Sequence, residues 1–398
     1  MKLNSSAASL HLCTAVVAAL IAVPAVLVAQ SPRGAPESRL RPAADELQKT
    51  FSVIASVREL ADGRVLVSDE KEAVLALADF RTQTVRQIGR QGAGPGEYRQ
   101  LGRIWALAGD SSLMKEPFAP RWIAFRRDDA VATAGAADPA VRIVGMNRIA
   151  GTDTLGHVFW LQVARGVDGR PSMRDSMFVV RLDRHSLKVD TIARAQSEDG
   201  WAAGAGVSSR AAPVAARAGG GSATPRAYAL ALSAPDQIAV FADGWVAVAR
   251  AAPYRIEWCP ANRACRAGPV LQAVQPPMSD REKRAYLVAA ATTQSWPPTT
   301  EISETSGWPS TVPPFVTPTS RIDASALLPL PDGRLLVERL STAAAPSRRY
   351  DIIDRSGAVV AHLQMELTER IVGVSARFAY VAVIDDDGLQ HLRRHPWP

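Results

Sequence analysis

The sequence predicts an all-β protein, a six-bladed β-propeller with four-stranded blades, one short helix and two loop insertions. Asp-Gly turns followed by short apolar runs recur along the chain, and further strand-like runs follow each of them. Together they repeat every ~40 to 50 residues, which is typical of propeller blades. With 398 residues, 47% of them hydrophobic, the chain has ample material for a core, and a closed all-β ring reaches this length as one unit.

The N-terminus has the features of a signal peptide. Lys2 provides a positive start, Leu10 to Val28 is almost wholly apolar, and small residues lead up to Ala29. We therefore expect residues 1–29 to be removed and the protein to be periplasmic or secreted, with no integral membrane span. A retained membrane anchor is the alternative, because the apolar run is close to the minimum length of a span.

The clearest strand signal is an Asp-Gly pair between two strand-like runs. It occurs at Gly63, Gly244 and Gly333, and the runs that follow include Val65 to Val67 and Leu335 to Val337. Asp-Gly suits the positive φ angles of a tight hairpin turn. A second strand that is covered on both faces should be continuously apolar, as these runs are.

The repeats divide the chain from residue 51 to residue 398 into six blades. The expected ranges are Phe51–Ile88, Arg103–Val144, Asn147–Ala193, Gln237–Gln272, Arg321–Leu363 and Arg370–Arg394. The last range is short of a full blade, and a ring must hide its edges. We therefore expect the segment 30–50 to close the last blade with a strand from Leu40 to Lys49, which Pro42 restricts to an edge position.

Two insertions interrupt the repeat, at 196–226 and 274–320. The first is rich in Ala, Gly and Ser, and we expect a mobile loop there. In the second, Ser279 and Glu282 fit a capping box, which predicts a short helix to about Thr292. Its remainder is rich in Pro, Thr and Ser and carries tryptophans, so we expect a long loop that is either a contact surface or a peripheral decoration.

Two cysteines remain once Cys13 leaves with the signal peptide. Cys259 and Cys265 flank a Pro-Ala-Asn turn after a strand-like run. An even pair in an exported chain predicts a disulfide, here across a hairpin, with free thiols or a metal site as the alternatives. A structural zinc needs four ligands, and no further His or Cys lies close by in the sequence.

The charge pattern argues against nucleic acid as a partner. The formal net charge is +7, but the arginines are scattered singly and form no runs with interleaved aromatic residues. A weak attraction to anionic surfaces such as acidic glycans stays open, beside a plain arginine-rich surface.

A glycine-rich phrase between the first two blades is the most specific local motif. It lacks the Lys-Ser/Thr ending and the strand-to-helix context of a phosphate loop, so we interpret it as a compact connector that Glu97 and Tyr98 hold in place. Its seven marked positions are Gly89, Gly92, Gly94, Pro95, Gly96, Glu97 and Tyr98.

This connector resembles that of the NHL-like six-bladed β-propellers of exported bacterial proteins, which carry Gly-x-x-Gly-x-Gly-Pro-Gly-Glu-aromatic between their first and second blades. The seven positions match it one by one. The resemblance is strong over Phe51 to Trp105, fair from Gln237 to the C-terminus and poor through Gly109 to Arg226. It implies the fold and export, and it brings no catalytic residue.

No motif for catalysis or metal binding stands out. Acidic residues at strand ends suit a calcium site in the channel, but their spacing matches no ligand pattern, and Asp385 to Gly388 is more economically a hairpin turn. These residues are Asp69, Glu70, Glu338, Asp354 and Asp385. The histidines show no paired spacing for a metal or a Ser/His/Asp arrangement. They are His157, His185, His362, His391 and His395.

We therefore expect a non-enzymatic, monomeric propeller without a cofactor. Its ligand, a protein, glycan or small molecule, would meet the channel mouth or the insertion 274–320. The alternative is a metal-dependent hydrolase or lactonase with a divalent ion, calcium foremost, in the central channel. A purely structural role in the cell envelope is a third possibility that the sequence does not separate from these two.

Overall fold

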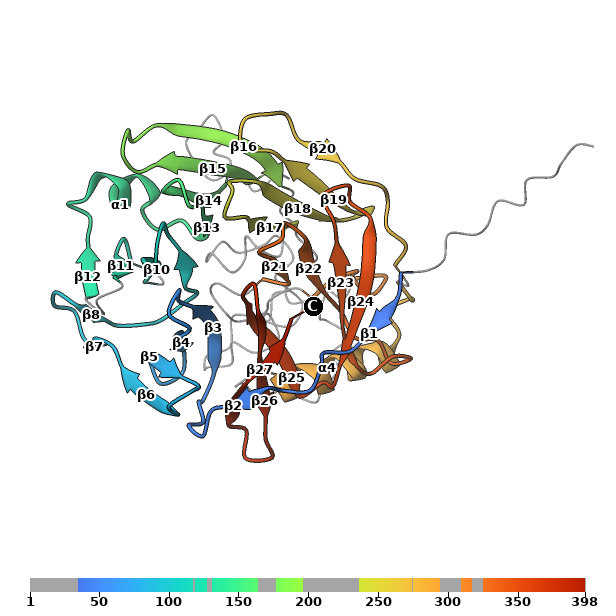
Figure 1. Cartoon of the computed structure of the whole chain (residues 1–398). Helices are drawn as coiled ribbons and strands as arrows, with labels where there is room; N and C mark the ends of the chain where they lie inside the picture. Colours follow the sequence, from blue (N-terminus) through green and yellow to red (C-terminus); the bar gives the residue numbers. More distant parts are fainter. Residues whose placement is uncertain are drawn as a thin grey trace, which may run out of the picture. The chain divides into compact units, whose positions relative to one another are not determined.

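The fold is a ring of six sheets, which are the blades of a propeller (Figure 1); each has four antiparallel strands, and one has a fifth, parallel strand at its edge. A computed structural model describes residues 35–116, 119–126, 131–163, 177–195, 236–273, 275–293, 309–316 and 325–397. Two helices, α1 and α4, accompany the sheets in these ranges. The prediction of an all-β six-bladed propeller is confirmed.

The strands of each blade pair in chain order. Blade 1 holds β3 (Ile54–Glu59), β4 (Val65–Asp69), β5 (Val74–Asp79) and β6 (Thr84–Gln87). Blade 2 holds β9 (Trp105–Ala106), β10 (Ser112–Lys115), β11 (Trp122–Phe125) and β12 (Val131–Ala134). Blade 3 holds β13 (Ile149–Thr152), β14 (His157–Val163), β15 (Met177–Asp183) and β16 (Val189–Ala195).

The second half of the chain repeats this arrangement. Blade 4 holds β17 (Gln237–Val240), β18 (Val246–Ala251), β19 (Tyr254–Cys259) and β20 (Arg266–Ala267). Blade 5 holds β21 (Leu327–Pro329), β22 (Leu335–Arg339), β23 (Arg348–Ile353) and β24 (Val359–Met365). Blade 6 holds β25 (Glu369–Val374), β26 (Phe378–Ile384) and β27 (Gln390–Pro396). First strands contact one another, β3 with β25 and β13 with β9 and β17, so they line the central channel.

The N-terminal segment supplies edge strands to the last two blades. β2 (Asp45–Glu46) pairs antiparallel with β27 and is the fourth strand of blade 6. β2 lies within the range from Leu40 to Lys49 in which we expected a closing strand, and Pro42 takes no part in its pairing. β1 (Glu37–Ser38) pairs parallel with β24 and adds a fifth strand to blade 5, which no pattern in the sequence indicated.

The core lies between neighbouring blades. Val65 to Val67 of β4 and Leu335 to Val337 of β22 are buried on both faces, as their apolar runs predict. The largest buried side chains include Trp160 and Trp258, which pack in clusters between blades 2 and 3 and between blades 4 and 5. Each blade thus removes its apolar surface from water only by stacking on its neighbours.

The expected extent of blade 2 is wrong at its end. Strand β12 ends at Ala134, and residues up to Val144 form helix α1 (Pro139–Val144). The Asp138 carboxylate accepts a hydrogen bond from the Ala140 N–H at 2.8 Å, and proline occupies the first helical position. Asp at the cap and Pro after it are helix-start signals, and a helix lets Val141 and Val144 reach the same core.

Helix α4 (Asp280–Thr293) occupies the range that the capping box predicts, but only half of the box forms. The Ser279 hydroxyl accepts from the Glu282 N–H at 3.3 Å. The Glu282 carboxylate does not return the bond, because it accepts from the Ala343 N–H at 2.8 Å and so ties the helix to blade 5. The Glu282 side chain therefore stabilises the contact between α4 and blade 5 and does not cap the start of the helix.

Two expected segments lie outside the described residues, the signal peptide 1–29 and the insertion 196–226. Of the insertion 274–320, the structure describes 275–293 and 309–316. Within the described ranges, no helix combines the length and hydropathy needed to cross a membrane.

Candidate functional site: a cavity at the channel mouth

A small, open-sided cavity lies in the channel between blades 1, 2, 5 and 6. Its walls come from the starts of first strands, the ends of second strands, the start of the third strand β23 and the connector before β9. In an antiparallel pair these positions lie at the same end. We call this end of the ring the mouth face. Its polar lining residues are Ser56, Glu70, Arg103, Ser325, Glu338, Tyr350 and Arg370.

Two arginines reach the cavity from either side of blade 1. Arg370, on β25, donates through Nη2 to the Ile54 carbonyl at 2.7 Å, which holds its guanidinium beside the start of β3. Arg103 lies on the connector that leads into β9. The Ser56 hydroxyl of β3 accepts from the Ile104 N–H at 2.8 Å and fixes that connector next to β3.

Another wall of the cavity carries Glu338, whose carboxylate is paired with the buried Arg348. Glu338, at the end of β22, forms an ion pair with Arg348, whose guanidinium is buried and also donates to the Leu367 carbonyl at 3.1 Å. Burial lowers the pKa of Arg348, but the Glu338 carboxylate outweighs it, and the net shift is upward. The Arg348 guanidinium therefore stays charged beside the Glu338 carboxylate.

Tyr350 completes this wall and stays protonated. Its hydroxyl accepts from the Ile371 N–H at 3.2 Å, which joins blade 5 to blade 6. Burial raises the pKa of Tyr350 above its ordinary value, and the nearby Glu338 carboxylate raises it further. The group therefore remains a neutral hydrogen-bonding hydroxyl at any ordinary pH.

The insertion 274–320 is anchored on the same mouth face. The Val316 N–H donates to the Glu338 carbonyl at 3.0 Å, and Gln237 donates to the Val316 carbonyl at 2.6 Å. Arg339 donates to the Pro314 carbonyl. Residue 338 thus belongs to the cavity wall through its side chain and to the anchor of the insertion through its backbone.

Behind that anchor, a buried carboxylate joins blades 4 and 5. Asp351 accepts from the Tyr254 hydroxyl at 3.1 Å and from Arg339 at 2.8 Å, and it lies 2.8 Å from His362 Nδ1. Burial raises the pKa of Asp351, but the contacts with His362 and Arg339 outweigh it and lower the pKa overall. These groups satisfy one another and lie outside the cavity lining, so we interpret them as structural.

The glycine-rich connector lies between blades 1 and 2. Its strands β7 (Arg90–Gln91) and β8 (Glu97–Tyr98) pair in parallel. The buried Tyr98 hydroxyl donates to the Ile88 carbonyl at 2.8 Å, and Glu97 accepts from the Gly94 N–H at 2.7 Å. A side chain at Gly92 would overlap the Glu97 carboxylate. Residues 89–98 therefore shape the entry to blade 2, while Leu101, Gly102 and Arg103, just beyond, reach the cavity.

The disulfide prediction is confirmed, and the free-thiol and metal alternatives are wrong. Cys259 and Cys265 are bonded across the turn between β19 and β20. Cys259 is buried in the core between blades 3 and 4 and does not line the cavity.

The acidic residues marked at strand ends do not converge on one site. Glu70 and Glu338 line the cavity. Asp69 instead accepts from the Ser52 N–H at 2.7 Å and from the Val53 N–H at 3.1 Å, and Asp354 and Asp385 accept within their own hairpin turns. Over the described ranges, no three His, Cys, Asp or Glu side chains form a group suited to a metal ion.

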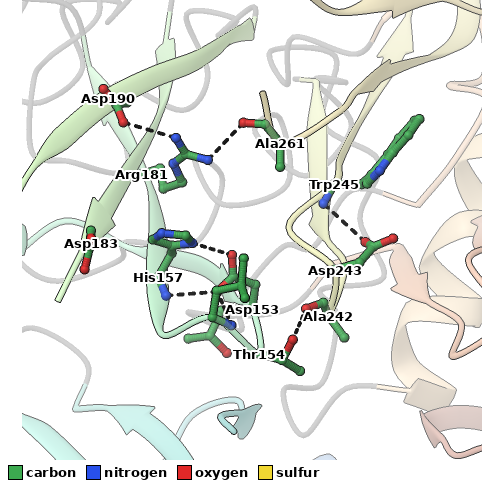
Figure 2. Close-up of polar contacts among 12 residues, drawn as sticks. Asp153, Thr154, His157, Arg181, Asp183, Asp190, Ala242, Asp243, Trp245 and Ala261 are labelled. Carbon is green, nitrogen blue, oxygen red and sulfur yellow. Dashed lines mark hydrogen bonds and ion pairs between the residues drawn. The ribbon is translucent and has the colours of Figure 1, made fainter. Parts of the chain in front are cut away.

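The histidines do not share a site, and His157, His362, His391 and His395 each contact a different partner. Figure 2 shows His157, whose Nδ1 is 2.6 Å from Asp153, at the turn between the first two strands of blade 3. Next to it, the Thr154 hydroxyl donates to the Ala242 carbonyl at 2.8 Å and joins blade 3 to blade 4. First-to-second-strand turns lie at the end of the ring opposite the mouth face. This cluster therefore ties two blades together away from the cavity.

Comparison with known proteins assigns the chain to no family. No family model and no curated protein matches the chain. Among solved structures, it is similar to regucalcin, a calcium-binding protein from Agrobacterium tumefaciens, with 10% identity over 91% of this chain and 97% of that one and a TM-score of 0.39. It is also similar to virginiamycin B lyase from Staphylococcus aureus, with 7% identity over 89% and 87% and a TM-score of 0.38.

A third similar structure is a member of the DUF4221 family from Bacteroides vulgatus, with 8% identity over 89% and 96% and a TM-score of 0.45. Similarities at this level carry no function to the chain. The assignment of a propeller rests on the sheet topology itself.

Proposed function

We propose that this chain is an exported binding propeller that holds a small ligand in the cavity at the channel mouth. The observation that carries the proposal is the convergence of charged and hydroxyl groups from several blades on one cavity whose other walls are apolar, such as Leu101, Leu328 and Ile371. A concave site with a few convergent polar groups on an apolar background is the usual form of a ligand pocket.

Binding is favoured over catalysis by the state of the cavity's groups. The Glu338 carboxylate is engaged by Arg348, and burial keeps Tyr350 protonated. A general base needs a free carboxylate or a pKa near neutrality. Both groups are instead suited to hold a ligand in one orientation.

Export and NHL-like ancestry belong to the same proposal. The leader-like residues 1–29, the disulfide and the connector phrase from Gly89 to Tyr98 support them. The described part of the insertion lies beside the mouth, where it would contact a ligand or a partner that enters the channel.

A metal-dependent hydrolase is the second candidate, because Glu70 and Glu338 both line the cavity and carboxylates are calcium ligands. The residues fit a divalent ion poorly, since the pairing of Glu338 with Arg348 places a cation there already. Stoichiometric calcium or zinc in the purified protein, lost in the Glu70→Gln variant, would favour this candidate over simple binding.

The binding proposal is tested by blocking the cavity. Compounds that bind the parent protein are selected from a small-molecule library by ligand-observed NMR and then measured against Leu328→Trp, which fills the cavity. Leu389→Trp, the same change at an exposed position in the last hairpin, is the control. We expect binding to be lost in the first variant and kept in the second. Equal binding to both variants, or no binding to the parent, contradicts the proposal.

A further inference from the structure

We infer that the Gln237 side chain couples the insertion to the cavity, so that the shape of the cavity wall depends on how the segment 309–316 is seated. The inference deepens the proposed function and rests on it for the use of the cavity. Gln237 itself does not line the cavity. It is buried at the start of β17 in blade 4 and acts through the residues that it holds, as a positioning residue.

The Gln237 amide binds the insertion with one end and the cavity wall with the other. Its Nε2 donates to the Val316 carbonyl of the insertion at 2.6 Å. Its Oε1 accepts from the Ala326 N–H at 2.8 Å and from the Ser325 hydroxyl at 3.4 Å. Ser325 and Ala326 line the cavity just before β21 begins. One side chain thus joins the insertion to the start of blade 5.

Two backbone hydrogen bonds close these contacts into a circuit. The Val316 N–H donates to the Glu338 carbonyl at 3.0 Å, and the Glu338 N–H donates to the Ala326 carbonyl at 2.8 Å. Together with the bonds of the Gln237 amide to Val316 and Ala326, they form a closed ring of contacts. Glu338 and Ala326 both line the cavity. A displacement of the insertion therefore reaches two positions of the wall.

The circuit requires an amide at residue 237. An amide offers a donor and an acceptor on the same carbon, whereas a carboxylate only accepts and a thioether has no hydrogen to donate. Water does not readily replace these partners, because Gln237 is only 7% exposed. A buried polar group that loses its partner costs stability. Loss of the amide should therefore loosen the insertion and the wall at the same time.

The segment 309–316 is also held by packing and by a bond to the stretch before α4. Phe315 is fully buried between blades 4 and 5 in the same cluster as Ala326, so apolar packing accompanies the circuit. Val312 is buried outside this cluster, and its N–H donates to the Pro276 carbonyl at 2.9 Å. Residue 312 is therefore the position from which the coupling can be tested apart from that packing.

Hydrogen–deuterium exchange followed by mass spectrometry tests the coupling without a ligand. Gln237→Met keeps the length of the side chain and removes the amide. We expect backbone exchange to become at least about tenfold faster in both 309–316 and 325–328. Exchange in β4 of blade 1 should stay as in the parent protein, because the circuit does not reach that blade.

The reverse experiment starts from the insertion. Val312→Ala removes two buried methyl groups and should speed exchange at least about threefold in 325–328 of the parent protein as well as in 309–316. In the Gln237→Met background the same change should have no further effect on 325–328, because the connection is already broken. Such non-additivity is the signature of coupled residues, and a merely structural glutamine would not produce it.

Gln390→Met is the matched control. Gln390 is also buried, and its Oε1 accepts from the Ile54 N–H at 2.8 Å at the seam between blades 6 and 1. This variant should leave exchange in 309–316 and 325–328 at the parent values. Near-ultraviolet circular dichroism shows that each variant is folded. If Gln237→Met does not fold, Val312→Ala in the parent background carries the test.

The outcomes distinguish this inference from the proposed function. Faster exchange in only one of the two ranges, or uniformly in all blades, overturns the coupling through Gln237. The same holds if Val312→Ala leaves 325–328 unchanged in the parent protein, or if its effect there adds in full to that of Gln237→Met. None of these results touches the binding function, which the library screen and Leu328→Trp decide by themselves.

Discussion

The Tyr380 hydroxyl of the last blade donates a hydrogen bond to the Glu59 carboxylate of the first blade, with 2.8 Å between the two oxygens. The residues are 321 positions apart in the chain, so this bond crosses the seam where the ring closes. Arg377 pairs with the same carboxylate. The seam is thus held by a charged hydrogen-bond network as well as by the edge strand β2.

Removal of this bond should weaken the ring. We expect Tyr380→Phe to lower the free energy of unfolding by about 1 to 2 kcal/mol, because a partly buried carboxylate loses one donor. Urea unfolding at pH 7 measures the change. Glu37→Gln, which removes an exposed carboxylate paired with Arg349, is the control and should cost less than about 0.5 kcal/mol. If both variants lose a similar amount of unfolding free energy, the bond between Tyr380 and Glu59 stabilises the ring no more than an exposed ion pair does.

Acid should weaken the same seam. Burial raises the pKa of Glu59, but hydrogen bonds from Ser375, Arg377 and Tyr380 outweigh it and hold the pKa below its ordinary value of 4.5. A carboxylate with a lowered folded pKa stabilises the protein above its unfolded pKa, and this stabilisation is lost as the pH falls through the folded value. Between pH 5 and pH 3, the free energy of unfolding should therefore fall less steeply in Glu59→Gln than in the parent. Parallel curves would contradict the assignment.

At the seam, the backbone at Gly373 lies very close to the backbone of blade 1. One added methyl group at this position should therefore destabilise the fold strongly. A Cβ at Gly373 would lie 2.5 Å from the carbonyl oxygen of Val57 in blade 1. We expect Gly373→Ala to destabilise the protein by about 1 to 3 kcal/mol, because two backbones must separate. Gly135→Ala is the matched control, since no atom lies within 4 Å of its Cβ position, and it should change stability by less than about 0.5 kcal/mol. Thermal unfolding followed by circular dichroism compares the two, and equal midpoints would refute the close approach.

The disulfide should contribute modestly to stability. Cys259 and Cys265 close a short loop, and short loops restrict the unfolded chain less than long ones. Reduction should therefore lower the free energy of unfolding by no more than about 3 kcal/mol and leave the fold intact. Chemical unfolding with and without reductant measures the effect, and the double variant Cys259→Ala, Cys265→Ala should be insensitive to reductant. Loss of the β spectrum on reduction would mean that the bridge is essential.

Local patterns predicted the strands and turns well. Gly63 and Gly333 both have φ of +86°, the left-handed conformation that the Asp-Gly turns require. Helix α4 begins next to Ser279, as the capping box indicates. Helix α1 was missed although Asp138 and Pro139 are start signals, because the apolar run after them also suits a strand.

The cavity was largely missed. Glu70 and Glu338 were marked as acidic strand ends, but nothing in the sequence pointed to Arg103, Arg370 or Tyr350. An arginine at the start of a strand is an ordinary surface residue in a linear sequence. Its place in a cavity depends on which blades meet around the channel.

The architecture follows from the amino-acid order alone, because turn chemistry, strand alternation and a repeated module are properties of neighbouring residues. The pairing of β1 with β24, the ion pair of Glu338 with Arg348 and the placement of Arg103 and Arg370 on one cavity were decided only when the ring closed. Closure joins residues hundreds of positions apart, and no local preference of the chain encodes which of them will share one cavity.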